Sequence, residues 1–214
     1  MAPSIDHLAI AAASLEDQRL DALLGVPLSP GGRHARMGTH NRLLRLGPTS
    51  YLELIAIDPQ GTVPGRPRWF ELDDPAMQAR LSAGPRFVHW VARAGSTELP
   101  PLPIDLGPWE PFQRGDLSWQ LTVRPDGTLP ADGVVPSLIF WPGAAHPATR
   151  LPDLGVTLDA LELEHPRAAD VQRQLDLLGL DVRCTHASLP RLVAHLRTPA
   201  GARTLRSTEP VRRA

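Results

Sequence analysis

Two histidines occupy the same place in two similar apolar segments of this 214-residue chain. His7 lies in residues 5–10 (IDHLAI), and His89 lies in residues 87–92 (FVHWVA). Each segment is followed by a second apolar segment, and the first of these, residues 51–55 (YLELI), carries Glu53. A duplicated module that brings a strand histidine and a strand carboxylate to one cleft is a way to build a metal site. In the second copy, residues 138–141 (LIFW), alignment by pattern puts Phe140 opposite Glu53.

Glu53 raises a question of its own, because a buried carboxylate without a partner is costly. It should meet a metal, an arginine or another hydrogen-bond donor, and a structural ion pair is the alternative to a functional role. For His7 and His89 the alternative is a hydrogen-bonded core histidine. Their equivalent positions favour a shared pocket.

Further candidates for chemistry lie in and near the glycine-rich loop at residues 31–41 (GGRHARMGTHN). His34 or His40 could act as an acid or base or as a substitute ligand, and a hydrogen-bonded loop histidine is the alternative. Asn41 ends the loop. Arg114, in residues 113–116 (QRGD), could hold an anionic substrate by a bidentate contact, or it could simply reach solvent.

The elements that must position these residues follow one order. Residues 5–57 are predicted to form a strand, a helix capped by Ser14 and ended by Gly25, and then two or three strands. Residues 87–142 repeat the order, but the prolines of residues 95–103 exclude a helix there.

A third copy spans residues 156–207, with a strand at 158–164 and a helix from Pro166 that ends at Gly179. Alignment of the copies puts Ala160 opposite His7 and Arg206 opposite Glu53. This copy therefore keeps the architecture without the candidate ligands, and we expect it to be structural.

Composition excludes several mechanisms. All 22 basic residues are arginine, so Schiff-base and P-loop lysine chemistry are excluded, and GxGxxG is absent; we expect no nucleotide cofactor. The single Cys184 excludes an intrachain disulfide. A net charge of −1 predicts no nucleic-acid partner, and no apolar run suggests a membrane span. With no signal-like N-terminal series, the expected location is the cytoplasm.

The strand–helix–strands order, with His on the first strand and Glu on the last, resembles the vicinal oxygen chelate superfamily. The resemblance rests on residues 6–10 (DHLAI), 32–34 (GRH) with 38–41 (GTHN), 51–54 (YLEL), and 136–141 after Trp119. Within the superfamily the sequence is most similar to the glyoxalase-like domain group of bacterial proteins. The resemblance implies an α+β fold of repeated βαβββ modules. Residues 1–150 would pair two modules in a cupped mixed sheet, and residues 151–214 would add the degenerate third module and a tail.

The resemblance also implies a site. A divalent metal (Zn, Fe, Mn or Ni) would be held at the floor of the cup by His7, Glu53 and His89, with Phe140 at the fourth position as an apolar wall. Glu53 or His40 would move a proton. The small-molecule substrate would contact four residues: His34, Asn41, Arg114 and Phe140.

The function favoured from the sequence is a metal-dependent lyase, isomerase or dioxygenase that acts on a small polar metabolite. The alternative is a metal-free protein that binds a small molecule in the same cleft. A homodimer is a possible assembly.

Overall fold

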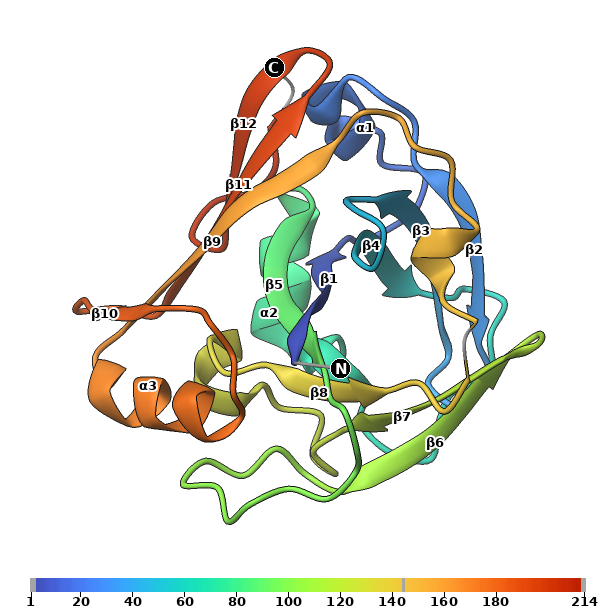
Figure 1. Ribbon diagram of the computed structural model, residues 1–214. Helices are drawn as coiled ribbons and strands as arrows, with labels where there is room; N and C mark the ends of the chain where they lie inside the picture. Colours follow the sequence, from blue (N-terminus) through green and yellow to red (C-terminus); the bar gives the residue numbers. More distant parts are fainter. Residues whose placement is uncertain (1–2, 144, 213–214) are drawn as a thin grey trace.

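The computed structural model describes residues 3–143 and 145–212 (Figure 1). The elements of its first sheet and the segments between them are β1 (Ser4–Ala11), α1 (Arg19–Leu24), β2 (Ser29–His34), β3 (Thr39–Arg45), β4 (Tyr51–Ile57), η1 (Trp69–Glu71), α2 (Pro75–Ser82), β5 (Arg86–Arg93), β6 (Trp109–Arg114), β7 (Leu117–Thr122), η2 (Pro130–Gly133) and β8 (Ser137–Phe140). The remaining elements are η3 (Pro147–Thr149), β9 (Thr157–His165), α3 (Ala168–Leu177), β10 (Cys184–His186), β11 (Arg191–Thr198) and β12 (Gly201–Arg206).

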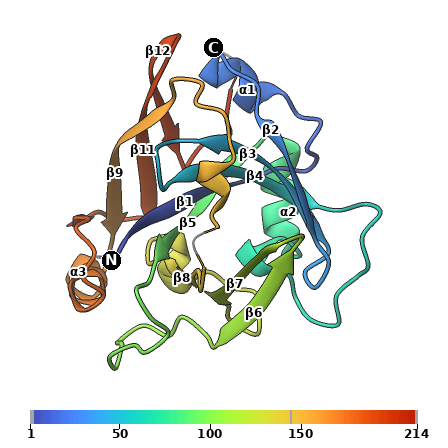
Figure 2. The same ribbon diagram turned by 45° about the vertical axis from the view of Figure 1, so that its right-hand side comes forward.

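The first sheet has eight strands in the order β2-β3-β4-β1-β5-β8-β7-β6. In each half the first strand runs parallel to the last, β1 to β4 and β5 to β8, and the other neighbours are antiparallel. The sheet curls around its concave side, and its edge strands β2 and β6 come into contact (Figures 1 and 2). The prediction of a sheet-dominated α+β fold with a curved mixed sheet is confirmed.

The two halves meet where β1 pairs antiparallel with β5, and this ladder is symmetric about the Leu8–Trp90 pair. His7 faces Val91 and Ala9 faces His89, so the two histidines are structurally equivalent. The ladder also has an extra residue on each strand, Asp6 on β1 and Val88 on β5, at equivalent positions. A local pseudo-twofold therefore relates the strands that carry the candidate residues.

The sheet register corrects one sequence assignment. Glu53 pairs with Ala9, and the residue that pairs with Val91 in the other half is Ser137. Ser137 therefore occupies the position equivalent to Glu53, and the alignment with Phe140 was wrong. The segment before β8 contains the η2 turn, in which Ala131 and Asp132 have positive φ, and apolar patterns do not reveal how many residues such a turn uses.

Local signals account for two helix ends. Gly25 ends α1 with a φ of 71°, and Asp74 caps α2 by accepting hydrogen bonds from the backbone N–H groups of Ala76 and Met77. Residues 94–108 contain no helix, as their prolines predicted. The prediction that α1 begins after Ser14 was wrong, because Ser14 instead accepts from the backbone of Glu16 in a turn and the helix begins at Arg19.

The second sheet has four strands in the order β10-β9-β11-β12. The predicted strand–helix–strands order is present, but β9 pairs with β10 and β11 and not with the last strand. Ala160 faces His195, so the alignment of Ala160 and Arg206 with His7 and Glu53 does not hold in the structure.

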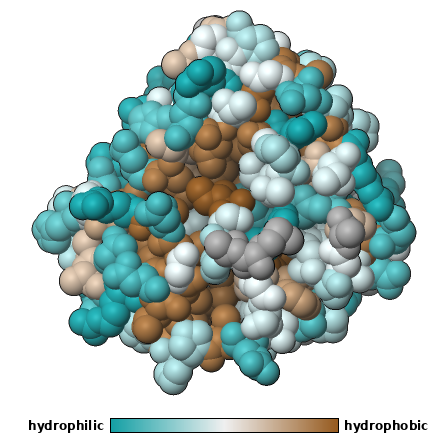
Figure 3. Space-filling model, viewed as in Figure 1, coloured by the Kyte–Doolittle hydropathy of each residue, from teal (hydrophilic) through white to brown (hydrophobic). Residues whose placement is uncertain are grey.

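The second sheet and α3 share a buried apolar cluster with the first sheet. Val171 and Leu192 belong to the same cluster as Leu8 and Leu24. On the face of Figure 1, apolar side chains gather over the region where the two sheets meet (Figure 3). No helix in the described part of the chain is long and apolar enough to cross a membrane.

Candidate functional site

A small cavity lies inside the curled first sheet, and the centre of a water molecule can occupy about 30 Å³ of it. Side chains from β1, β2, β3, β4 and β6 supply the polar part of its lining. The rest of the lining is aromatic and aliphatic. The lining residues are His7, His34, Asn41, Tyr51, Glu53, Trp69, Phe70, Arg114, Trp119, Leu121, Ile139 and Trp141.

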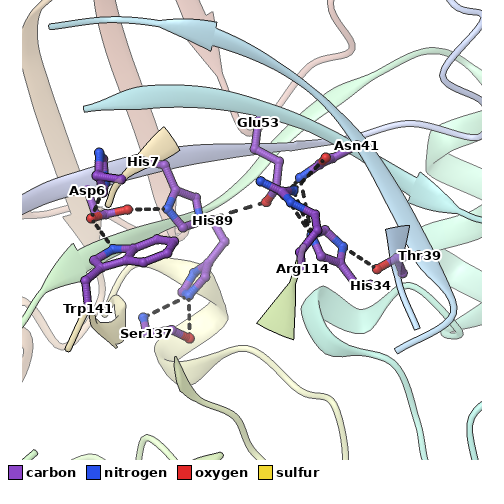
Figure 4. A network of polar contacts seen from close by, with 11 residues as sticks. Asp6, His7, His34, Thr39, Asn41, Glu53, His89, Arg114, Ser137 and Trp141 are labelled. Atoms are coloured by element: carbon purple, nitrogen blue, oxygen red, sulfur yellow. Dashed lines mark hydrogen bonds and ion pairs between the residues drawn. The ribbon is translucent and has the colours of Figure 1, made fainter. Parts of the chain in front are cut away.

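His7 is oriented by the residue before it. Its Nδ1 lies 2.9 Å from Oδ1 of Asp6 (Figure 4). Its ring stacks on Tyr51 with a centroid distance of 4.6 Å. Neighbouring residues of a regular strand point to opposite faces, but Asp6 is the extra residue of the β1–β5 ladder, which allows the two side chains to meet. Nδ1–H donates to Asp6, so in the neutral ring Nε2 presents its lone pair to the cavity.

Asp6 is a fully buried carboxylate with five donor contacts. Beside His7, it accepts from Nε and Nη2 of Arg93, from Nε1 of Trp141 and from Nε2 of His146. Burial alone would raise the pKa of Asp6, but the hydrogen bonds from His146 and His7 hold that pKa well below its usual range. Asp6 is therefore ionised whenever the protein is folded near neutral pH.

Glu53 lies across the cavity from His7, and its Oε2 is 3.8 Å from Nε2 of His7. Its other oxygen, Oε1, accepts a 2.5 Å hydrogen bond from Nδ2 of Asn41. Glu53 is 5% exposed, so this buried carboxylate has the partners that its burial requires. One oxygen is held and the other faces His7.

His34 is the second histidine beside Glu53, with its Nε2 at 3.9 Å from Oε1. Nδ2 of Asn41 and Nη1 of Arg114 lie 3.3 and 3.4 Å from this Nε2, and both are donors only. Nε2 is therefore the acceptor and Nδ1–H donates to Oγ1 of Thr39. Burial lowers the pKa of His34 to about 4, although Glu53 opposes the shift, so the ring is neutral at pH 7.

Arg114 is the last residue of β6 and reaches across to the opposite edge of the sheet. Its Nη1 donates to Oδ1 of Asn41 over 3.0 Å, and the same oxygen accepts from the backbone N–H of Gly32. The two glycines of the loop make room for this approach. A Cβ on Gly31 would lie 2.0 Å from Asn41 Oδ1, and one on Gly32 would lie 2.6 Å from Cδ of Arg114.

His89 has a different environment from its counterpart His7. Its Nδ1 donates to the carbonyl of Gly133 over 3.0 Å, so Nε2 is the acceptor. Nε2 accepts a 3.0 Å hydrogen bond from the backbone N–H of Ser137 and lies 3.1 Å from Oγ of the same residue. Burial lowers the pKa of His89 to about 3. Both ring nitrogens are occupied, and the positions equivalent to Asp6 and Glu53 hold Val88 and Ser137.

Comparison with known proteins decides the family. The family model described as "Glyoxalase-like domain" matches residues 5–179, most of the chain. The chain belongs to the glyoxalase-like domain family.

Among solved structures, this glyoxalase-like chain is similar to a hypothetical protein from Staphylococcus aureus, with a TM-score of 0.56, 11% identity and 88% of each chain covered. A triple mutant of 4-hydroxymandelate synthase from Streptomyces coelicolor matches with a TM-score of 0.46 and 14% identity, over 96% of this chain and 63% of that one. No curated protein sequence matches this one. At 11% identity the likeness to the Staphylococcus aureus protein concerns the fold alone.

The structure brings together five of the residues singled out from the sequence. The cavity is lined by His7, His34, Asn41, Glu53 and Arg114. The remaining three do not reach it. His89 is sealed by Gly133 and Ser137, whereas His40 and Phe140 alternate with the lining residues Asn41 and Ile139 on their strands and so point to the opposite face.

Sequence reasoning missed Asp6, its donors Trp141 and His146, and the aromatic lining from Trp69 and Phe70. One signal for Asp6 was present, since a carboxylate beside His7 in an otherwise apolar strand requires partners for the same reason as Glu53. Nothing local linked the distant His146 to the site.

The residues present do not fit the metal centre expected of the glyoxalase-like fold. His7 and Glu53 present a free nitrogen and a free oxygen to each other, but the third expected ligand, His89, has no lone pair left. Among residues 3–143 and 145–212, no group of three His, Cys, Asp or Glu side chains is placed to hold an ion. A catalytic zinc site has three protein ligands as a rule. The expected trio of His7, Glu53 and His89 is therefore corrected to a pair.

Proposed function

We propose that this glyoxalase-like protein is an enzyme that moves a proton on a small polar metabolite bound in the cavity, with His7 as the base. One observation carries the proposal. The 2.9 Å contact between Asp6 and Nδ1 of His7 leaves Nε2 free to face the cavity. A histidine held by a buried carboxylate in this way is a common arrangement for general acid–base catalysis.

The roles of the neighbouring groups follow from their charges. When Nε2 takes a proton from the substrate, the imidazolium that forms is stabilised by the ionised Asp6 behind it. Oε2 of Glu53, 3.8 Å from Nε2, stabilises the same positive charge from the other side. Asn41 holds the second oxygen of Glu53 and keeps the carboxylate in this orientation.

The rest of the cavity suits a reaction protected from water. Trp69, Phe70 and Trp119 supply its aromatic wall, and all three are buried. A dry wall strengthens the electrostatic interactions of the polar part. These groups support an isomerisation or an elimination by proton transfer, among the reaction types expected from the sequence.

Hydrogen–deuterium exchange tests the proposal before the full reaction is known. A panel of small hydroxy- and keto-compounds is incubated with the protein in D₂O. NMR then measures how fast deuterium replaces the protons bound to the carbon adjacent to an oxygen-bearing carbon. We expect wild type to catalyse exchange in part of the panel. His7→Gln should slow that exchange by about 10² to 10⁴-fold, and Glu53→Gln should also slow it. His40→Gln is the matched control on the opposite face and should exchange like wild type.

The same measurement separates the proposal from the alternative of a binding protein. Saturable binding of a panel compound without any exchange would favour the metal-free binding protein. Exchange that is equal in wild type and in His7→Gln would show that His7 is not the base.

A further inference from the structure

Two guanidinium donors of Arg114 pair with no protein group among residues 3–143 and 145–212. Nη1 accounts for both of its polar contacts, to Asn41 and His34. Nε and Nη2 have no hydrogen bond in the part of the chain that the structure describes, and Arg114 forms no ion pair there. Nε and Nη2 together are the edge of a guanidinium that matches the two oxygens of a carboxylate.

This cation stands among neutral groups. Asn41 is an uncharged amide, and His34 is neutral because burial lowers its pKa to about 4. Asn41 bonds to both Arg114 and Glu53, so the Glu53 carboxylate is held by the amide and forms no ion pair with Arg114 (Figure 4). Arg114 is half-buried and lines the cavity, where the attraction between opposite charges is stronger than in water.

The chain is built to bring this arginine to that place. Gly31 and Gly32 lack the Cβ atoms that would collide with Asn41 and Arg114. The two edge strands also contact each other without a backbone ladder, so side chains such as Arg114 bridge the gap between them.

We propose that the substrate carries a carboxylate, which binds to the Nε–Nη2 edge of Arg114 while the carbon to be deprotonated faces His7. The position of the reacting carbon beside His7 rests on the proposed function, and the binding of the carboxylate to Arg114 does not. Binding of the carboxylate depends on Arg114, whereas proton transfer depends on His7, so the two can fail separately.

Matched pairs of charged and neutral probes test the inference by titration calorimetry. The pairs are lactate with lactamide and pyruvate with pyruvamide, which differ only in the group that faces Arg114. We expect wild type to prefer the carboxylate by at least about tenfold. Arg114→Gln should abolish the preference, and Arg114→Lys, which keeps the charge without the bidentate edge, should keep part of it.

Two controls make the result specific. Arg33→Gln removes an exposed arginine of β2 that pairs with Asp58 outside the cavity, and it should leave the preference unchanged. His7→Gln should also bind the carboxylates, even where it fails in proton exchange. The inference is overturned if wild type shows no preference for either carboxylate, or if a folded Arg114→Gln variant keeps the full preference.

Discussion

Asp6→Asn is the substitution that tests the site most directly, because one buried carboxylate organises both the fold and the orientation of His7. The change keeps the shape of the side chain and removes its charge. Four of the five donor contacts fall on Oδ2, and the fifth, from His7, falls on Oδ1. An amide cannot accept at both positions, so its NH₂ group meets either His7 or the group of donors around Arg93.

The expected loss of stability follows from the burial of the pair. Asp6 is fully buried and the Arg93 side chain is 13% exposed, so solvent screens their interaction little. Removing one member of a buried ion pair costs about 3 to 5 kcal/mol. For a chain of this size that corresponds to a fall in Tm of roughly 6 to 20 °C.

The pH dependence has a defined sign. The folded pKa of Asp6 lies below its unfolded value, so its contribution is present in full above the unfolded pKa of 3.8 and is lost as the pH falls toward the folded pKa. The difference between wild type and Asp6→Asn should therefore be largest above about pH 5 and shrink at lower pH.

Asp6→Asn should also alter the chemistry of His7. If the amide NH₂ faces Nδ1, that nitrogen must accept, and the proton of the neutral ring moves to Nε2. In that orientation, proton exchange on a substrate should fall by about 10² to 10⁴-fold.

Urea unfolding between pH 3 and 7 measures the stability, and NMR of the imidazole nitrogens identifies the tautomer. Asp116→Asn is the control, because Asp116 and Arg150 form an exposed pair that should contribute little. A loss below about 1 kcal/mol, within the range of an exposed ion pair, would refute the reasoning. So would a His7 ring that carries its proton on Nε2 and still exchanges substrate protons at the wild-type rate.

Three further predictions concern the rest of the molecule. His89 is buried in the neutral form with a pKa of about 3, whereas an unfolded histidine takes a proton near pH 6.5. The free energy of unfolding should therefore fall as the pH drops from 6.5 toward 3, by up to about 1.4 kcal/mol per pH unit. Urea unfolding of His89→Gln should show a weaker dependence of that free energy on pH. Deletion of residues 156–214 should give aggregated or unfolded protein by size-exclusion chromatography and circular dichroism, because Leu192 and Val171 share the core of the first sheet, and a soluble, folded fragment would contradict this. Thermal melts with Zn, Mn, Ni or Fe(II) should show no stabilisation of wild type, and a metal-dependent rise in Tm that disappears in His7→Gln would contradict the conclusion about the donor set.

Periodicity and repetition in the sequence were sufficient for the general fold. Strand-length apolar segments, a proline-rich segment that excludes a helix, and a helix end at Gly25 each depend on short-range physics, and each is present in the structure. The repeated histidines correctly indicated that β1 and β5 are equivalent. Only the structure shows that the glycines before His34 leave room for Asn41 and Arg114.

Register and hydrogen-bond partners were decided only by the tertiary structure. A turn of unknown length before β8 moves the position equivalent to Glu53 from Phe140 to Ser137, and strand periodicity cannot detect such a shift within an apolar run.

The contrast between His7 and His89 shows the same limit at the level of chemistry. The two residues have the same type and equivalent places, yet Asp6 leaves one ring free to react, while Gly133 and Ser137 close the other. The sequence by itself determined which residues could carry the chemistry of this glyoxalase-like protein. Long-range contacts decided which of them keep a free nitrogen, because the partners that close His89 lie 44 and 48 residues away along the chain.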